Sequence, residues 1–299
     1  MIQYLSSLTP PIPFDFGEVA CGPGSIPGDS YILERSLGAA LWQIDFMLYS
    51  MTVGVNRVHI QSGYGFNFSL WQPDDFAGSP AAVYANYYAH VFVASLIGRS
   101  GSMQAVELAG GDDTHVSYAA YDNGTLARVA LVNMDFFDGT TSDASSRTST
   151  NFTVAVPQGV RTYTVHTLTG PEGAMAIDTS NIFFAGQTYT LDQDGMAQLN
   201  SSVSAISNGT VQNGQVTVSV AASEAVILYM GDVGMNGTST TGSSSSTMMP
   251  SSTSTGGPSS TGGGVSPAAA TESQKGAANG LGVQIGAVFV VAVLTALVL

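Results

Sequence analysis

The chain has 299 residues, of which only 9% are charged, and its formal net charge is −14 at pH 7. Soluble proteins commonly carry about 25% charged residues, so this composition is far from average. Six arginines and Lys275 oppose 21 acidic residues, which excludes binding of nucleic acid through its phosphates. The length allows one large or two ordinary domains.

The sequons of the chain fit passage through the secretory pathway, where a single cysteine suggests a free thiol or a missing partner. Cys21 is the only cysteine, so no disulfide can form within the chain. Asn-x-Ser/Thr sequons predict N-glycosylation. They begin at Asn67, Asn123, Asn151, Asn200, Asn208 and Asn236.

The first hundred residues predict two strand–helix units. An apolar strand, Phe14 to Glu18, ends on a carboxylate, and the loop from Cys21 to Asp29 follows it. A helix from Tyr31 to Val53 leads to a second strand, Val55 to Ile60. The order strand, loop, helix, strand is that of a parallel α/β unit, in which catalytic groups sit at the carboxyl ends of strands.

Both predicted helices have apolar residues at helical spacing. In the first, Asp29 or Ser30 is the expected N-cap and Gly54 the C′ residue. Its predicted buried stripe is Leu33, Leu37, Leu41, Ile44, Leu48 and Met51. The second is expected to be capped by Ser79, to have Pro80 at its first position, and to run to Ile97 before Gly98. Its predicted buried stripe is Val83, Tyr87, Val91 and Ala94.

From Ser102 onward the apolar period becomes two, which predicts strands. The expected strands are Met103–Leu108, His115–Tyr121, Leu126–Asn133, Phe152–Val156, Arg161–Leu168, Thr188–Leu191, Gln215–Val220 and Glu224–Met230. Asn123-Gly124 and Asn213-Gly214 each predict a hairpin. An antiparallel β-sandwich is the expected fold of this part, with an open barrel as the alternative.

The C-terminal part is expected to lie outside any folded domain. Gly237 to Thr271 contains no charged residue and is rich in Ser, Thr and Gly, which predicts a disordered stalk. The apolar run Ile285 to Leu299 is shorter than the ~20 residues of a spanning helix. Small residues precede it, so we expect a GPI-attachment signal with Ala278 or Asn279 as the attachment site. A tail-anchoring helix is the alternative.

Several blocks of the chain resemble glycoside hydrolase family 79, which includes β-glucuronidases and heparanase. Gly17-Glu18 with the loop Cys21-Gly22-Pro23-Gly24 is similar to the family's nucleophile loop, and Ser36 to Asp45 to the helix that follows. Val58-His59-Ile60 through Pro73 looks like the last barrel strand and its loop. Leu126 to Asn133 resembles a strand of the family's C-terminal β domain.

The resemblance implies an α+β chain. Two strand–helix units from the end of a (β/α)₈ barrel would occupy residues 1–100, and a β-sandwich residues 101–232. A Ser/Thr/Gly-rich linker, 233–275, and the GPI signal, 276–299, would follow. The first helix would then direct its stripe of Leu33, Leu37, Leu41 and Ile44 at barrel strands outside this chain. We therefore expect it to expose apolar surface in the isolated chain.

The resemblance also implies site residues. Glu18 would be the nucleophile of a retaining mechanism, which needs a second carboxyl group about 5–5.5 Å away. The family's acid/base glutamate lies in an Asn-Glu pair, and no Asn-Glu occurs in this sequence. Gly22 and Gly24 match a loop that binds the sugar carboxylate through backbone N–H groups, although Pro23 removes one such group.

Tyr64 and His59 are further candidate substrate-binding residues, with an exposed loop aromatic and an ordinary barrel histidine as the alternatives. Asp74 and Asp75 are interpreted as surface turn residues. The four histidines lack ligand spacing, so no metal and no cofactor are expected.

Two functional hypotheses follow. The first is the C-terminal fragment of a secreted retaining glycosidase that acts on β-linked uronic acid in glycans and is inactive alone, because the acid/base is absent. The second is a non-catalytic, GPI-linked surface glycoprotein whose sandwich binds glycan or is structural. Both place the protein outside the cell, on the membrane surface, and need a signal peptide, which the segment from Met1 to Leu5 does not provide.

Overall fold

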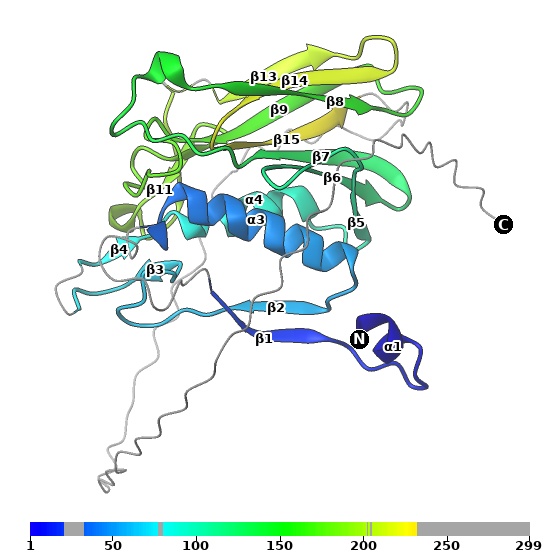
Figure 1. Ribbon diagram of the computed structural model, residues 1–299, viewed down its shortest axis with the longest axis horizontal. Coiled ribbons are helices and arrows are strands. Elements are labelled where there is room, and N and C mark those ends of the chain that lie inside the picture. The colour runs from blue at the N-terminus through cyan, green and yellow to red at the C-terminus, as the bar shows by residue number, and fades with distance from the viewer. Residues whose placement is uncertain (21–32, 77–79, 202, 204, 232–299) are drawn as a thin grey trace, which may run out of the picture. The chain divides into compact units, whose positions relative to one another are not determined.

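The computed structural model describes residues 1–20, 33–76, 80–201, 203 and 205–231, all within one compact unit of the chain (Figure 1). The helical elements among them are α1 (Ile2–Ser6), α3 (Leu37–Thr52), α4 (Asn86–Ile97), η1 (Ala144–Ser146) and η2 (Leu191–Gln193). The strands of the N-terminal part are β1 (Asp15–Val19), β2 (Arg57–Ile60), β3 (Trp71–Gln72) and β4 (Ala82–Val83). The remaining strands are β5 (Met103–Glu107), β6 (His115–Asp122), β7 (Thr125–Asn133), β8 (Ser149–Ala155), β9 (Thr162–Thr169), β10 (Phe183–Phe184), β11 (Gln187–Tyr189), β12 (Ala197–Leu199), β13 (Ile206–Thr210), β14 (Gln215–Ala221) and β15 (Glu224–Gly231).

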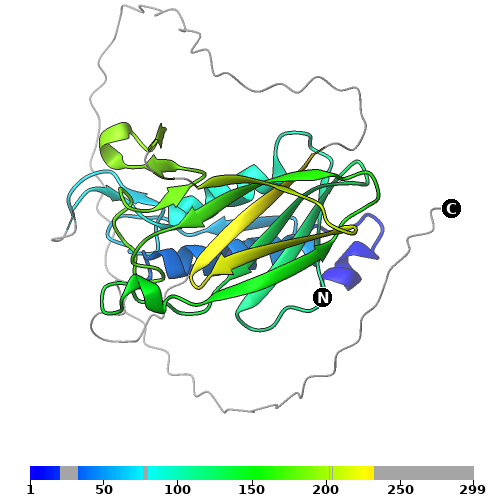
Figure 2. The same ribbon diagram turned by 90° about the horizontal axis from the view of Figure 1, so that it is seen from above.

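A large antiparallel sheet is the centre of the described fold. Its strand order is β12-β11-β10-β9-β15-β7-β6-β5, and β13 also pairs with β9. Strands β8 and β14 form a separate antiparallel ribbon that runs from Gln215↔Ala155 to Ala221↔Ser149. The ribbon covers one face of the sheet, as Figure 2 shows from above. The predicted sandwich-like β part is therefore confirmed.

Both faces of the sheet are buried, because a different layer covers each. In β7, Val129 and Leu131 pack in the core shared with the ribbon, whereas Ala130 and Val132 pack in the core shared with α3 and α4. Successive side chains of a strand point to opposite faces, so one apolar run fills both cores. The pair β1–β2 lies on the far side of the helices from the sheet (Figure 1).

Helix α3 begins later than the sequence predicted. Its N-cap is Ser36, whose side chain accepts a hydrogen bond from the Ala39 N–H, whereas Asp29 and Ser30 lie outside the described residues. Leu33 is 44% exposed, so its place in the buried stripe was wrong.

The expected exposure of the remaining α3 stripe is also corrected. Leu37, Leu41 and Ile44 are at most 1% exposed, and they pack in one core with α4 and the sheet. Burial of these three side chains therefore does not depend on strands outside this chain.

Helix α4 also differs from its prediction. It begins at Asn86 after the N-cap Ala85, because Ala82 and Val83 pair with β3 as a strand. The buried face is Asn86, Tyr88, Ala89, Phe92, Val93 and Leu96, so the predicted stripe was one residue out of register and Ala94 is exposed. The predicted end is confirmed, since Gly98 is the C-cap with φ +68°.

The two Asn-Gly turns have different outcomes. Asn123 and Gly124 have positive φ angles of 49° and 77°, and they join the paired strands β6 and β7 as predicted. Asn213 and Gly214 also have positive φ angles. The strands on either side of this second turn enter different layers, because β13 pairs with β9 and β14 pairs with β8. The second hairpin turn is confirmed at its base, because Gln212 and Gln215 each donate a backbone N–H to the other's carbonyl over 2.9 Å. Beyond that bridge β13 and β14 do not pair, so the turn links the two layers.

Candidate functional site

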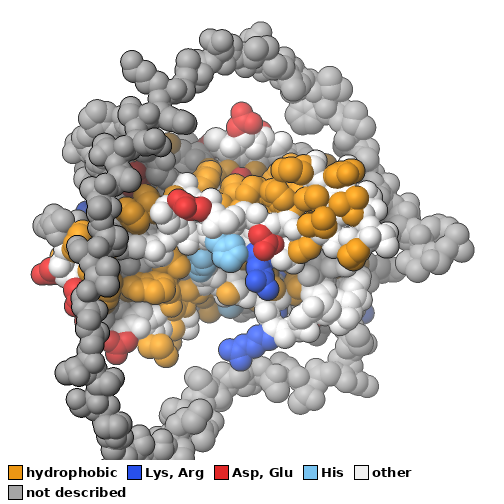
Figure 3. Space-filling view, turned by 90° about the horizontal axis from the view of Figure 1, so that it is seen from below, with side chains coloured by type: hydrophobic (Ala, Val, Ile, Leu, Met, Phe, Trp, Pro, Cys, Tyr) orange, Lys and Arg blue, Asp and Glu red, His pale blue; other side chains and the backbone are white. Residues whose placement is uncertain are grey.

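The parallel strands β1 and β2 present a polar face to the surface. Asp15 pairs with Arg57, Phe16 with Val58, and Val19 with Ile60. The exposed side chains on this face are Asp15, Glu18, Arg57 and His59. Figure 3 views the molecule from this side, where histidine, acidic and basic side chains lie between areas of hydrophobic side chains.

A bulge in β1 places Glu18 opposite His59 in the pairing of the two strands. The register shifts between Phe16 and Val19, so Gly17 and Glu18 together lie opposite His59 alone. A bulge of this kind bends a strand and redirects a side chain, and bulges are common beside active sites. Glu18 is therefore an exposed residue near the carboxyl end of a parallel strand, and His59 is the residue opposite it on the neighbouring strand.

The opposite face of the pair is held by aromatic side chains. Phe16 packs against Phe46 of α3, with ring centres 5.5 Å apart, and Phe46 stacks on Trp42 at 5.3 Å. Backbone hydrogen bonds extend the pairing at both ends, from Asn56 N–H to Phe14 C=O and from Gln61 N–H to Val19 C=O, each 2.8 Å long. The candidate nucleophile therefore sits on a strand that α3 supports.

The loop after β2 is tied to itself by side-chain hydrogen bonds. The Gly63 N–H donates to Ser69 Oγ, which in turn donates to the Gly63 carbonyl, each over 2.9 Å. The Gly65 N–H donates to Gln72 Oε1 over 3.1 Å. The Tyr64 hydroxyl donates to Asp74 Oδ2 over 2.7 Å, and this bond raises the pKa of Tyr64.

Asp74 and Asp75 are surface residues, as the sequence predicted, but each has a bonding role that the sequence did not reveal. Asp74 accepts a hydrogen bond from the Tyr64 hydroxyl, and Asp75 Oδ1 accepts one from the Ala81 N–H over 2.8 Å. No local spacing indicates the Tyr64–Asp74 pair, because it depends on how the loop folds back on itself.

The other predicted site residues lie outside the described residues, are exposed, or are half-buried. Gly22, Gly24, Cys21, Asn236, Ala278 and Asn279 lie outside the described residues. Among the sequons, Asn123, Asn151 and Asn208 are exposed. Asn67 and Asn200 are half-buried. Glycosylation of all of them stays a prediction.

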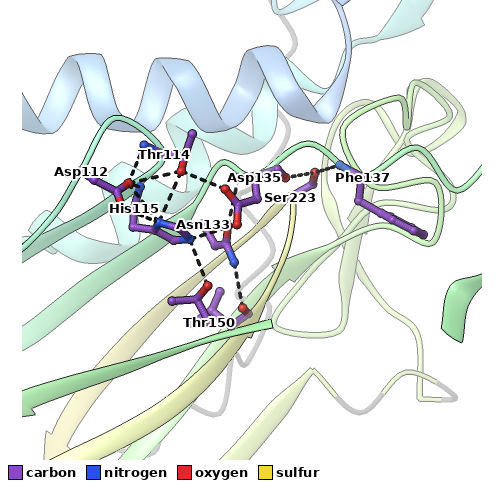
Figure 4. Close-up of polar contacts among 9 residues, drawn as sticks. Asp112, Thr114, His115, Asn133, Asp135, Phe137, Thr150 and Ser223 are labelled. Atoms are coloured by element: carbon purple, nitrogen blue, oxygen red, sulfur yellow. Dashed lines mark hydrogen bonds and ion pairs between the residues drawn. The ribbon is translucent and has the colours of Figure 1, made fainter. Parts of the chain in front are cut away.

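A second polar cluster surrounds His115 and was not predicted (Figure 4). The Nδ1 atom of His115 lies 3.0 Å from the Asp112 carboxylate, and its Nε2 atom lies 3.1 Å from Asp135 Oδ2 and 3.0 Å from Thr150 Oγ1. Thr114 Oγ1 donates to Asp135 Oδ1 over 2.8 Å. The cluster joins the start of β6, the end of β7 and the ribbon strand β8.

Neither polar cluster forms a metal centre within the described ranges. No group of three or more His, Cys, Asp and Glu side chains there is arranged to hold a metal ion.

Burial lowers the pKa of both His90 and His166, which favours their neutral form. The helices of residues 1–231 that can be described include none both long and apolar enough to cross a membrane.

Comparison with known proteins confirms the resemblance. Residues 117–227 match the family described as the glycosyl hydrolase family 79 C-terminal beta domain. A beta-glucuronidase of Aspergillus niger is 34% identical over 163 residues, which is 52% of this chain and 29% of that protein. A beta-glucuronidase of Neurospora crassa is 34% identical over 121 residues, or 37% of this chain and 22% of that protein.

A solved structure of similar fold supports the architecture described above. The crystal structure of a 4-O-alpha-L-rhamnosyl-beta-D-glucuronidase from Fusarium oxysporum aligns with a TM-score of 0.58 and 23% identity, over 73% of this chain and 43% of that one. The chain thus resembles β-glucuronidases, and its residues 117–227 resemble the family 79 C-terminal beta domain. It spans less than a third of the length of the curated relatives it matches.

Proposed function

We propose that the chain is the C-terminal part of a secreted retaining glycoside hydrolase that acts on β-linked uronic acid residues of glycans. The observation that carries this proposal is the position of Glu18, exposed at a bulge near the carboxyl end of β1 and opposite His59. The β-glucuronidase relatives and the family 79 β domain support the substrate class.

In this mechanism, Glu18 attacks the anomeric carbon and forms a covalent glycosyl-enzyme. The bond from that carbon to the leaving oxygen breaks, and the acid/base carboxyl group gives the oxygen its proton. Water, deprotonated by the same group, then releases the sugar. His59 and Tyr64 contact the substrate, together with Gly22 and Gly24, which follow β1 in the sequence.

The strands β1 and β2 are the last two of a (β/α)₈ barrel in this proposal. Parallel sheets are usually covered on both faces and rarely consist of two strands, whereas the outer face of β1–β2 is exposed and polar. Further strands would close the barrel and add the acid/base glutamate. The chain alone is accordingly inactive.

The test has two parts. The full chain is assayed with an aryl β-glucuronide, and turnover that disappears in Glu18→Gln would contradict the proposed inactivity. The transcript is then read upstream of Met1 for a signal peptide, further barrel strands and an Asn-Glu pair. If these are found, the longer protein should hydrolyse the glucuronide, and a 2-fluoro glucuronosyl fluoride should label Glu18 but not the Glu18→Gln variant.

We place the protein on the cell surface through a GPI anchor, with the 233–275 segment as a linker. Small residues before the apolar run Ile285 to Leu299 support this. Release from membranes by a phosphatidylinositol-specific phospholipase is the expected result. Detection of Leu299 on the mature surface protein by mass spectrometry would favour a tail anchor.

The second candidate is a non-catalytic surface glycoprotein. The observation in its favour is that the β part has its own two cores and that α3 and α4 complete one of them. A stop codon close upstream of Met1, with no coding sequence for further strands, would support this candidate over the enzyme.

A further inference from the structure

A hollow follows the free edge of the ribbon strand β8. Among the described strands β8 pairs only with β14, so its other edge has no partner strand. Consecutive residues of β8 line the hollow together with the segment 108–112, and its volume is about 220 Å³. We call it the β8 hollow. Its lining includes Leu108, Gly110, Asp112, His115, Ser117, Asn151 and Phe152.

The polar side of the β8 hollow is held by hydrogen bonds before any ligand arrives (Figure 4). Asp112 Oδ1 accepts from the backbone N–H groups of Thr114 and His115, over 2.9 and 2.8 Å. The other side of the His115 ring meets β8, where Nε2 lies 3.0 Å from Thr150 Oγ1. The Asp112 side chain is still 66% exposed, so its carboxylate can accept from a further donor.

The lining of the β8 hollow suits an uncharged sugar. It is fully described and includes neither Lys nor Arg, so no cationic side chain there would neutralise an anionic ligand. Asp112 and Ser117 can accept hydrogen bonds from hydroxyl groups, and Leu108 and Phe152 add apolar surface. Ligand sites commonly combine apolar surface with a few fixed polar groups. A pyranose ring has C–H groups for the first and hydroxyl groups for the second.

Asn151 is the sequon asparagine of this lining. Its side chain is exposed, and its sequon runs from Asn151 to Thr153. The Asn151 amide makes no hydrogen bond within the described residues. The other two exposed sequon asparagines are engaged, since Asn123 Nδ2 donates to a carboxylate over 3.3 Å and Asn208 Oδ1 accepts from a threonine over 2.9 Å. Asn151 thus has a free amide beside a hollow of suitable chemistry.

We propose that Asn151 carries an N-linked glycan whose first N-acetylglucosamine lies in the β8 hollow and joins β8 to the segment 108–112. In the attachment, Asn151 Nδ2 bonds to C1 of that sugar and loses a proton, while the bond from C1 to a lipid-linked diphosphate breaks. Pockets for drug-sized ligands measure about 300–1,000 Å³, so the β8 hollow has room for one ring and not for the whole glycan. The inference rests on the proposed secretion but not on the proposed hydrolase activity.

The experiment uses the full chain, secreted behind an added signal peptide by cells that make oligomannose glycans. Mass spectrometry of the peptide that contains Asn151 should show a glycan. Hydrogen exchange of residues 108–112 should be at least about threefold faster in Asn151→Gln than in the wild type, because the segment loses its contact with the sugar. Endoglycosidase H leaves the first N-acetylglucosamine on asparagine, so the treated wild type should keep the slow exchange.

Matched variants separate a sugar in the β8 hollow from a general effect of glycosylation. Asn208→Gln removes an exposed sequon on β13 and should not change exchange of residues 108–112. Thr153→Ala and Thr153→Ser form a second pair, of which only the serine variant keeps the sequon. Thr153→Ala should therefore exchange as fast as Asn151→Gln, and Thr153→Ser as slowly as the wild type.

An unglycosylated Asn151 would overturn the inference. So would equal exchange of residues 108–112 in the wild type and Asn151→Gln, or fast exchange after endoglycosidase H treatment. The proposed hydrolase has a separate readout, since labelling of Glu18 in the longer protein does not depend on Asn151. Labelled Glu18 with an unglycosylated Asn151 would refute this inference alone.

Discussion

The hydroxyl group of Tyr118 in β6 donates a hydrogen bond of 2.5 Å to Asp45 Oδ1 in α3. Tyr118 is 1% exposed, and burial together with this bond raises the pKa of its phenol. The contact joins the helix that supports β1 to the central sheet. It is therefore a direct link between the candidate site and the β part.

We expect Tyr118→Phe to destabilise the chain by about 1–3 kcal/mol, because Asp45 loses a donor in a partly buried position. Chemical denaturation measures the change. Tyr49→Phe is the matched control. Tyr49 lies in α3, as Asp45 does, but its side chain is 49% exposed. Equal midpoints for Tyr118→Phe and wild type would show that the bond contributes nothing to stability.

Arg147 fastens the loop before β8 to the sheet. Its Nε donates to the Ala222 carbonyl over 2.8 Å, its Nη2 to Ser223 over 3.1 Å, and its Nη1 lies 3.4 Å from Glu224 Oε1. A lysine cannot reproduce this planar set of donors. We predict that Arg147→Lys lowers the free energy of unfolding by about 2–4 kcal/mol.

The control for this variant is Arg161→Lys, because Arg161 is exposed. Surface substitutions usually change stability by less than about 0.5 kcal/mol. If the two lysine variants unfold at the same denaturant concentration, the guanidinium geometry of Arg147 has no special role.

Asp112 makes stability depend on pH in the acid range. The backbone N–H of Thr114, and then the His115 side chain, lower the pKa of Asp112 to about 2. A carboxyl group with a lowered pKa stabilises the fold above its unfolded pKa, about 3.9. That contribution is lost as the pH falls from about 4 through about 2. Asp112→Asn should remove it.

The measurement is the free energy of unfolding at intervals between pH 5 and pH 2. The wild type should lose stability more steeply than Asp112→Asn across this range, while the exposed neighbour variant Asp113→Asn should follow the wild type. Parallel curves for Asp112→Asn and wild type would contradict the prediction.

The strand β7 from Thr125 to Asn133 was predictable because a short, nearly continuous apolar run that follows a turn signal is typical of a strand buried on both faces. The buried face of α4 was not predictable from the sequence. Tyr87, Tyr88, Val91, Phe92 and Val93 give the helix apolar residues on several sides, so two stripes fit the spacing equally well. Packing against the sheet and α3 selects the stripe that contains Tyr88 and Phe92.

Contacts between distant residues were equally hidden from the sequence. Tyr64 and Asp74 meet only because their loop folds back, and His115 meets Thr150 only because the ribbon covers the sheet. The place of Glu18 at the end of a parallel strand followed from the order of elements. The bulge that sets it opposite His59 did not, because no residue pattern marks it.

The register of α4 can be tested by two truncations one residue apart. Phe92 is 0% exposed and packs against Phe184 of β10, with ring centres 5.5 Å apart, whereas Val91 is only partly buried. Phe92→Ala should therefore destabilise the chain by about 3–5 kcal/mol, the usual cost of removing a buried phenylalanine ring. Val91→Ala should cost less than about 1 kcal/mol, because less apolar area returns to water.

Because a ring is larger than an isopropyl group, a third variant, Val93→Ala, corrects for size. Val93 is 7% exposed and belongs to the buried face. Both valine truncations remove the same atoms, so a larger loss for Val93→Ala than for Val91→Ala reports burial alone. The sequence-based stripe requires the opposite order, and finding that order in thermal or denaturant unfolding would show that α4 packs through the face containing Tyr87 and Val91.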